Sequence, residues 1–395
     1  TLVANSNTLT VDTVNPTVTD VTASDLVITE ADVGAGTFNI AVTFSEAMNT
    51  AATPTLTFNP TVSSTLTLTG GVWSVGNTVY TATYNVADAN LVARNITVDV
   101  TGAQDASGNA QQDYTEVAEF SIVTVTTIGT GGDDSIQYYN LAGLTLDGGA
   151  NTAAGDTLLM SGTEVATVNL AAGDQTTGDS TIVNNFENVN ASAATVAVNL
   201  TGTAGVNVLT GGSQADTITG GGGADLLTGD TGNDTFNFAT ATDLQSATVA
   251  GGNDIDTIQM TAAVTLIDAN FASKTTVERL ALTGGSAITL GANANTAGIT
   301  SVITGAGATS ITSTAIATLA VDATALAQNV ALTLAGSSAE VVTGLVGNIT
   351  ASALTGALTI TTGDAADNGI SVTTGAATTS ITANGAGDVV TVNAT

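Results

Sequence analysis

Residues 202–237 read Gly202-Thr-Ala-Gly-Val-Asn-Val-Leu-Thr210, Gly211-Gly-Ser-Gln-Ala-Asp-Thr-Ile-Thr219, Gly220-Gly-Gly-Gly-Ala-Asp-Leu-Leu-Thr228 and Gly229-Asp-Thr-Gly-Asn-Asp-Thr-Phe-Asn237. These four nine-residue units share one register. Each unit opens with glycine, carries Asp or Asn at its sixth position and has a large apolar residue at its eighth. Glycine permits the backbone angles of a tight turn, and Thr beside the apolar residue favours extended backbone. Each unit therefore predicts a turn followed by a short strand.

Two units are predicted to make one coil of parallel β structure, so that their sixth residues stack along two edges. Asp216 is then expected over Asp234 on one edge, and Asn207 over Asp225 on the other. Paired strands lie roughly 4.8 Å apart, and carboxylates at that spacing repel each other unless a cation lies between them. Oxygen ligands from Asp and from turn carbonyls suit Ca²⁺ better than Zn²⁺ or Mg²⁺.

The pattern Gly-Gly-x-Gly-x-Asp-x-apolar-x resembles the calcium-binding nonapeptide array of RTX (repeats-in-toxin) proteins, which implies a parallel β-roll with several Ca²⁺ ions. Simple turns with solvated Asp are the alternative, but turn chemistry does not demand a nine-residue register. Asn207 is neutral and Gln214 replaces a glycine, so the first edge is expected to bind more weakly. Asp254 is either a second ligand or a solvated turn residue. The predicted metal positions are Asp134, Asp156, Asn207, Gly211, Asp216, Gly220, Asp225, Gly229, Asp234, Asp254, Asp256 and Asp388.

Charge and composition exclude several functions. The 395 residues include 3 Lys plus Arg and 34 Asp plus Glu, a formal net charge of −31. Nothing here could neutralise phosphates, so nucleic acid is not expected as a partner. Without His or Cys, Ser-His-Asp, Cys-His and His-ligated zinc chemistry are ruled out. A carboxylate pair could still cleave glycosides, but calcium accounts for the clear Asp positions, and no enzyme is expected. The chain has no apolar run of membrane-spanning length, so membrane insertion is not expected.

The N-terminal part has a different pattern. Alternating segments at 17–22, 38–44, 55–58, 64–68, 78–84 and 96–100 predict an antiparallel β-sandwich over residues 1–124. Val11–Pro16, Phe44–Met48 and Asp105–Asn109 resemble bacterial Ig-like repeats, which implies a spacer or adhesion module. Residues 1–14 are expected to be a linker or an exchanged strand, because Thr8-Leu-Thr-Val11 is strand-like and has no obvious partner. Asp12 is either a ligand of an interdomain Ca²⁺ or a solvated linker residue.

Residues 125–260 are assigned to the RTX-type β-roll and residues 261–395 to a ligand-poor β-solenoid. In the second segment, blocks such as Ile311-Thr-Ser313 and Leu358-Thr-Ile360 predict stacked rungs with inward apolar residues. Val277-Glu-Arg-Leu-Ala-Leu282 echoes Phe186-Glu-Asn-Val189, which suggests that two halves repeat one plan. Asp322–Leu326 is the one short helix candidate, and a turn is favoured there. The predicted fold class is therefore all-β, an Ig-like sandwich followed by a parallel β-roll and solenoid.

These features predict a secreted structural protein of the bacterial cell surface. Its expected role is a calcium-dependent, self-assembling subunit of an S-layer or surface fibre, because its Thr/Ala/Gly-rich, low-Lys, cysteine-free composition resembles RTX-bearing S-layer proteins. Its expected partner is itself, with cell-surface polysaccharide as a second candidate. The alternatives are a segment of a large RTX biofilm adhesin and the secretion module of an exported hydrolase. Calcium binding is expected to drive folding outside the cell.

Overall fold

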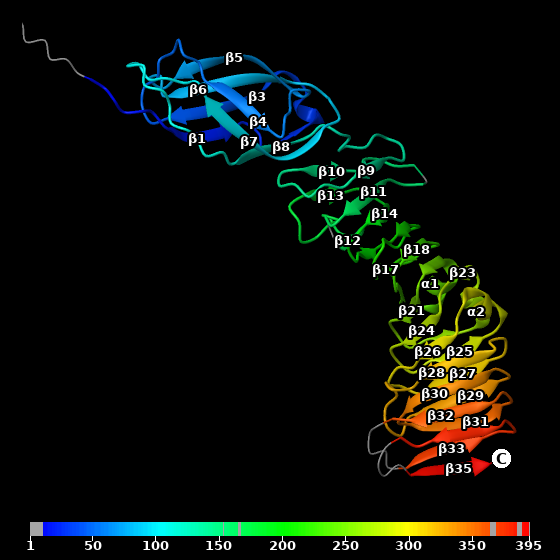
Figure 1. Ribbon diagram of the computed structural model, residues 1–395. Helices are drawn as coiled ribbons and strands as arrows, with labels where there is room; N and C mark the ends of the chain where they lie inside the picture. The colour runs from blue at the N-terminus through cyan, green and yellow to red at the C-terminus, as the bar shows by residue number, and fades with distance from the viewer. Residues whose placement is uncertain (1–10, 153, 165–166, 364–368, 385–388, 395) are drawn as a thin grey trace, which may run out of the picture. The chain divides into compact units, whose positions relative to one another are not determined.

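The computed structural model describes residues 11–152, 154–164, 167–363, 369–384 and 389–394. The predicted all-β class is confirmed, with 49% strand and 5% helix (Figure 1). The chain splits into two compact units, one ending at residue 128 with residues 140–145 added, the other formed by residues 129–139 and 146–395. The finer boundaries predicted at residues 124 and 260 stay predictions.

The first unit is built from two four-stranded sheets, ordered β1-β3-β6-β5 and β2-β8-β7-β4. The pairs are antiparallel except β2 with β8, which is parallel. Phe38 and Phe120 lie in the core with ring centroids 4.8 Å apart. This arrangement is compatible with the predicted sandwich. Its elements are β1 (Val18–Ala23), β2 (Val27–Thr29), η1 (Glu30–Asp32), β3 (Gly34–Phe44), β4 (Thr55–Asn59), β5 (Leu66–Ser74), β6 (Val79–Val86), β7 (Val92–Thr101) and β8 (Ala118–Val123).

The second unit is a parallel β-solenoid of about 11 turns over residues 135–393. One 11-stranded sheet runs through most of it. Its strands are β12 (Thr167–Asn169), β15 (Asn199–Thr201), β17 (Thr217–Thr219), β19 (Thr235–Phe238), β21 (Thr257–Met260), β24 (Arg279–Leu282), β26 (Ser301–Ile303), β28 (Thr318–Asp322), β30 (Ala339–Leu345), β32 (Leu358–Thr362) and β34 (Thr379–Thr382).

Two seven-stranded sheets form the other side of the coils, the first in the N-terminal coils and the second in the C-terminal coils. The first consists of β9 (Ser135–Gln137), β11 (Thr157–Gly162), β14 (Asn188–Ala194), β16 (Val208–Thr210), β18 (Leu226–Thr231), β20 (Thr248–Asn253) and β23 (Lys274–Thr275). The second consists of β22 (Thr265–Leu266), β25 (Ala287–Leu290), β27 (Thr309–Ser313), β29 (Ala331–Gly336), β31 (Asn348–Leu354), β33 (Ile370–Thr374) and β35 (Val390–Ala394). A separate pair is formed by β10 (Thr145–Asp147) and β13 (Ile182–Asn184).

The nine-residue repeat explains the coil. Two units make one turn, so Leu209 pairs with Leu227, and Ile218 with Phe236, each 18 residues further on. All four side chains are fully buried, because alternate residues of a strand point to opposite faces. Past the repeat the coil lengthens, and Phe236 pairs with Ile258, 22 residues on. The same inward apolar column continues through both parts of the solenoid.

Short helices accompany the change from one seven-stranded sheet to the other. They are α1 (Ala241–Ser246), η2 (Asp268–Phe271) and α2 (Ala292–Ala297). Figure 1 labels α1 and α2, and η2 contacts both of them. The sequence had not predicted them. The Asp268 carboxylate accepts hydrogen bonds from the backbone amides of Gly291 and Ala294, at 2.7 and 3.0 Å, and so stabilises the N-terminal end of α2. Residues 323–326, within the favoured turn, are not helical. No described helix has the length and apolar character needed to cross a membrane.

The turns of adjacent coils approach each other closely at Gly221. Its φ is +95°, and a Cβ there would lie 2.1 Å from the Thr203 carbonyl oxygen of the preceding coil. We expect Gly221→Ala to lose about 1–3 kcal/mol of stability, because left-handed strain and the clash add. Gly131→Ala is the control, since its Cβ would meet nothing within 4 Å. Urea unfolding at saturating calcium measures both. Equal losses in the two variants would show that turn stacking does not limit stability.

Candidate metal centre

A first ladder of carboxylates runs along one edge of the 11-stranded sheet and consists of Asp216, Asp234, Asp256 and Glu278. The Asp216 amide donates to Asp234 Oδ1 at 2.7 Å, and the Asp234 amide donates to Asp256 Oδ1 at 2.8 Å. The Asp256 amide donates to Glu278 Oε2 at 2.9 Å. Each aspartate immediately precedes its strand, so the parallel register brings one carboxylate per coil into the column.

A second ladder lies at the matching edge of the first seven-stranded sheet. The Asp134 amide donates to Asp156 Oδ1 at 2.7 Å, and the Asp156 amide donates to Glu187 Oε2 at 2.9 Å. The Asn207 amide donates to Asp225 Oδ1 at 2.9 Å. The side-chain amide of Asn207 donates to the Glu187 carbonyl at 2.6 Å. Asn207, the neutral residue of the second ladder, therefore links the run that ends at Glu187 to Asp225.

The glycine that opens each unit makes room for the carboxylate five residues later. A Cβ on Gly229 would lie 2.1 Å from Asp234 Oδ2 and 2.4 Å from the Gly251 carbonyl oxygen of the next coil. A Cβ on Gly220 would lie 2.2 Å from Asp225 Oδ2, and one on Gly211 would lie 2.4 Å from Asp216 Oδ2. Each of these sites thus has a carboxylate oxygen, and the sites at Gly211 and Gly229 also have a carbonyl oxygen of the next coil. These are the hard donors that Ca²⁺ prefers.

Burial makes the ladder carboxylates costly to ionise. Asp156, Asp234 and Asp256 are fully buried, and in each the Oδ2 atom has no hydrogen-bond partner among the described residues. Burial, with the charges of Asp216 and Asp256 nearby, raises the pKa of Asp234 to about 7. Burial likewise raises the pKa of Asp225 and of Asp256 to about 6. Buried oxygens without partners need an explanation, and a bound cation would supply both partner and charge. The residues therefore fit calcium.

Two ladder residues were missed in the sequence. Glu187 and Glu278 each end a run of carboxylates, and each follows a buried apolar residue, Phe186 or Val277. The echo between Phe186-Glu-Asn-Val189 and Val277-Glu-Arg-Leu280 was the signal. This repeated sequence pattern therefore coincides with the residue that ends each run of carboxylates.

Asp254 is not part of either ladder and is exposed in its turn with a φ of +76°. Asp388 lies outside the described residues. In the first unit, carboxylate oxygens of Asp12, Glu46 and Asp105 lie within 4.8 Å of one another. Both oxygens of Asp105 already accept hydrogen bonds from Asn109.

Residues 201–236 match the family model of the RTX calcium-binding nonapeptide repeat, in four copies. This segment belongs to the RTX repeat family. No curated protein and no solved structure matches the chain. RTX repeats bind calcium, which supports Ca²⁺ as the ion of this segment. Which residues ligate the ion stays a prediction.

Asp234→Asn separates the cost of a buried charge from the gain of a ligand. We expect this variant to need more calcium for folding, because a carboxylate ligand is lost. Without calcium near neutral pH it should hold at least as much strand structure as the unmodified chain, because the buried charge is gone. Circular dichroism during calcium titration measures both. Asp254→Asn, an equal charge change at an exposed turn, is the control. An unshifted calcium midpoint in Asp234→Asn would contradict the assignment.

Acid is expected to replace calcium in part. The pKa values of about 6 to 7 at Asp225, Asp234 and Asp256 lie above those of an unfolded chain. The folded state therefore keeps protons that the unfolded state releases, and its stability falls as pH rises from about 4 to about 7. In EGTA, strand content should be higher at about pH 5 than at about pH 8. With calcium present, strand content should instead be higher at about pH 8 than at about pH 5, since protons compete with calcium for the carboxylate ligands.

Proposed function

We propose that the chain is a building unit of a calcium-dependent extracellular assembly, an S-layer or a surface fibre. The RTX repeats and the solenoid fit an extracellular RTX-type protein. The finer role is supported by where the charge lies. A chain with a net charge of −31 repels its own copies, so close packing needs a surface without carboxylates.

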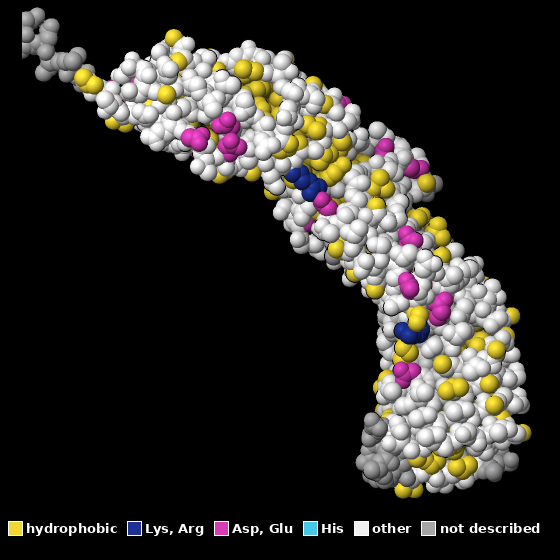
Figure 2. All heavy atoms as spheres, viewed as in Figure 1, with side chains coloured by type: hydrophobic (Ala, Val, Ile, Leu, Met, Phe, Trp, Pro, Cys, Tyr) yellow, Lys and Arg dark blue, Asp and Glu magenta, His cyan; other side chains and the backbone are white. Residues whose placement is uncertain are grey.

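The outer face of the β22–β35 sheet is such a surface. None of its seven strands contains a charged residue. The register aligns one row of small side chains across six of these strands, namely Thr265, Ala287, Ser310, Thr333, Thr350 and Thr373. Among the residues that Figure 2 colours by type, no acidic side chain is visible over the coils beyond β28. Two copies could approach here with the least electrostatic repulsion.

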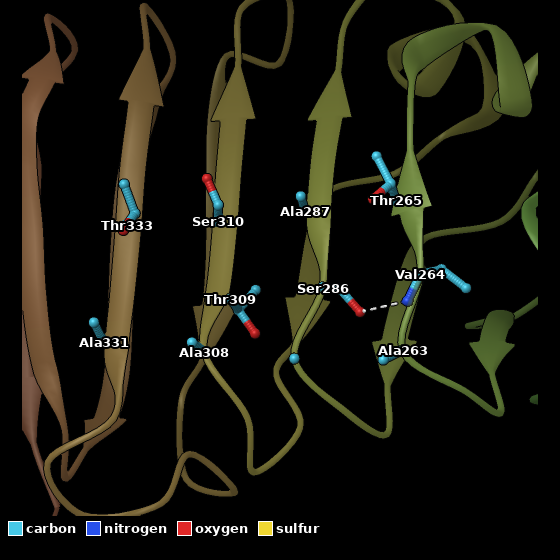
Figure 3. Close-up of a pocket in the computed structure, with 11 residues that line it drawn as sticks. Ala263, Val264, Thr265, Ser286, Ala287, Ala308, Thr309, Ser310, Ala331 and Thr333 are labelled. Atoms are coloured by element: carbon cyan, nitrogen blue, oxygen red, sulfur yellow. Dashed lines mark hydrogen bonds between the residues drawn. The ribbon is translucent and has the colours of Figure 1, made fainter.

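A shallow groove crosses four strands of this face. It has a volume of about 430 Å³ and is lined by Ala, Ser, Thr, Val and Gly residues. Figure 3 shows Ala287, Ser310 and Thr333 side by side along it. Neutral side chains of this size let another surface come close without burying a charge. This uncharged face is the observation that carries the proposal.

Calcium would control when the building unit forms. At cytosolic calcium the buried carboxylates oppose folding, and the chain stays exportable. At extracellular, millimolar calcium, ligand binding becomes folding free energy. Cell-surface polysaccharide is the second candidate partner, and the uncharged groove is where a neutral sugar chain would lie.

Assembly is tested by electron microscopy and sedimentation of the purified chain at millimolar calcium. We expect ordered sheets or fibres that EGTA disperses. Thr333→Glu should block assembly, because it adds a carboxylate to the uncharged face of each copy. Thr359→Glu is the control, since Thr359 is exposed on β32 of the other sheet. Both variants should fold with the same calcium midpoint.

Two results would contradict this function. A chain that folds with calcium yet stays monomeric at every concentration favours the adhesin segment, for which the N-terminal sandwich is the supporting observation. Assembly that survives Thr333→Glu but not Thr359→Glu would move the contact to the 11-stranded sheet and reject the uncharged face.

A further inference from the structure

Glu340 is a buried acid in the part of the solenoid that follows the aspartate ladder. It lies in β30 and is 1% exposed. Neither of its carboxylate oxygens has a hydrogen-bond partner among the described residues. Its own backbone amide donates to the Ala357 carbonyl at 2.8 Å, where a ladder residue would donate to a carboxylate. An ionised carboxylate in these surroundings would have neither water nor a partner.

The register places Glu340 in the same column as the first ladder. Val342 belongs to the inward apolar column, pairing with Val321 on β28 and Ile360 on β32. Glu340 lies two residues before Val342, just as Asp234 lies two residues before Phe236. The strands between β19 and β28 pair without a break in register. Glu340 therefore occupies a ladder position several coils beyond Glu278.

The local sequence is that of a degenerate nonapeptide. Ala335-Gly-Ser-Ser-Ala-Glu-Val-Val-Thr343 and Gly211-Gly-Ser-Gln-Ala-Asp-Thr-Ile-Thr219 share Gly, Ser, Ala and Thr at their second, third, fifth and ninth positions. Both carry an acid at the sixth position and an apolar residue at the eighth. Gly336, the second residue of this unit, has a φ of +108°, and Gly221, the second residue of the third RTX unit, has a φ of +95°.

The neighbouring coils lack the second carboxylate that a shared cation needs. Glu340 pairs with Leu319 on one side and with Leu358 on the other. Among residues 301–362, all of which the structure describes, Asp322 is the one other titratable side chain. Asp322 is half-exposed and accepts from the Thr324 amide and hydroxyl. The strands packed around Glu340, β28 and β32 in its own sheet and β29 and β31 in the facing one, bring no other charge toward it.

We propose that Glu340 is a ladder position that holds a proton where the RTX coils hold calcium, so that folding of the coils around β30 takes up one proton. Burial raises the pKa of Glu340 from its ordinary value near 4.5 to about 8. In the unfolded chain the Glu340 carboxyl is ionised above about pH 4.5, whereas in the folded chain it is ionised only above about pH 8. The stability of these coils therefore falls as pH rises from about 4.5 to about 8 and then levels off.

Native-state hydrogen exchange of the full chain at saturating calcium tests this proposal. The readout is the opening equilibrium constant of β28, β30 and β32 amides, corrected for intrinsic exchange, at about pH 5.5, 6.5 and 7.5. One proton taken up on folding makes that constant rise about tenfold per pH unit. Glu340→Gln should abolish the rise and increase protection most at the highest pH. Glu340→Leu, which matches the neighbouring Leu319 and Leu358, should do the same.

Asp322→Asn is the matched control, because it removes the other carboxylate of these coils and should keep the unmodified slope. Saturating calcium separates this effect from the ladders, whose coils should show no change in any of the three variants. A wild-type opening constant that does not change with pH would overturn the proposal. So would a pH slope that persists in both Glu340→Gln and Glu340→Leu.

Discussion

The constraint behind this molecule is the burial of carboxylates one coil apart. Asp216, Asp234 and Asp256 hold adjacent coils together because the amide of each donates to the carboxylate of the next. The same geometry places their negative charges where water cannot reach them. The same arrangement therefore produces both the hydrogen bonds between coils and the repulsion between carboxylates. A bound cation would offset the repulsion, so that the hydrogen bonds stabilise the stacked coils. The glycine turns follow from this, because a side chain at Gly229 would occupy the space of the Asp234 carboxylate.

The two parts of the solenoid meet this constraint differently. In the RTX coils the column is acidic and needs an ion. Beyond Glu278 the column passes through Leu319, Glu340 and Leu358. Both leucines are buried, and Glu340 is the acid that lies between them. The backbone pairing is parallel in both parts, so the identity of one residue per coil decides whether a rung adds a buried acid to the column.

Much of this architecture could be read from the sequence, because a nine-residue register leaves few alternatives. Two units per coil follow from it, and with them the neighbours of Asp216 and Asn207. The helices could not be read in the same way. The α2 segment, Ala292–Ala297, has no apolar periodicity, and its start is held by Asp268 from 23 residues earlier. Glu187 and Glu278 lie outside the nonapeptide pattern, and each takes its ladder place because it immediately precedes its strand, β14 or β24, in register with the preceding coil.

The ladder has a direction. Every amide in it finds its acceptor in the coil that follows along the chain, and Glu278 supplies the last acceptor of the first ladder. The ladder hydrogen bonds of a coil at the N-terminal side are therefore completed only when the coil at its C-terminal side is in place. Among the described residues, the coils beyond Glu278 carry no acidic ladder pair, so these residues stack without a shared ladder ion. They can serve as a preformed template on which the calcium-loaded coils are laid down one after another, toward the N terminus.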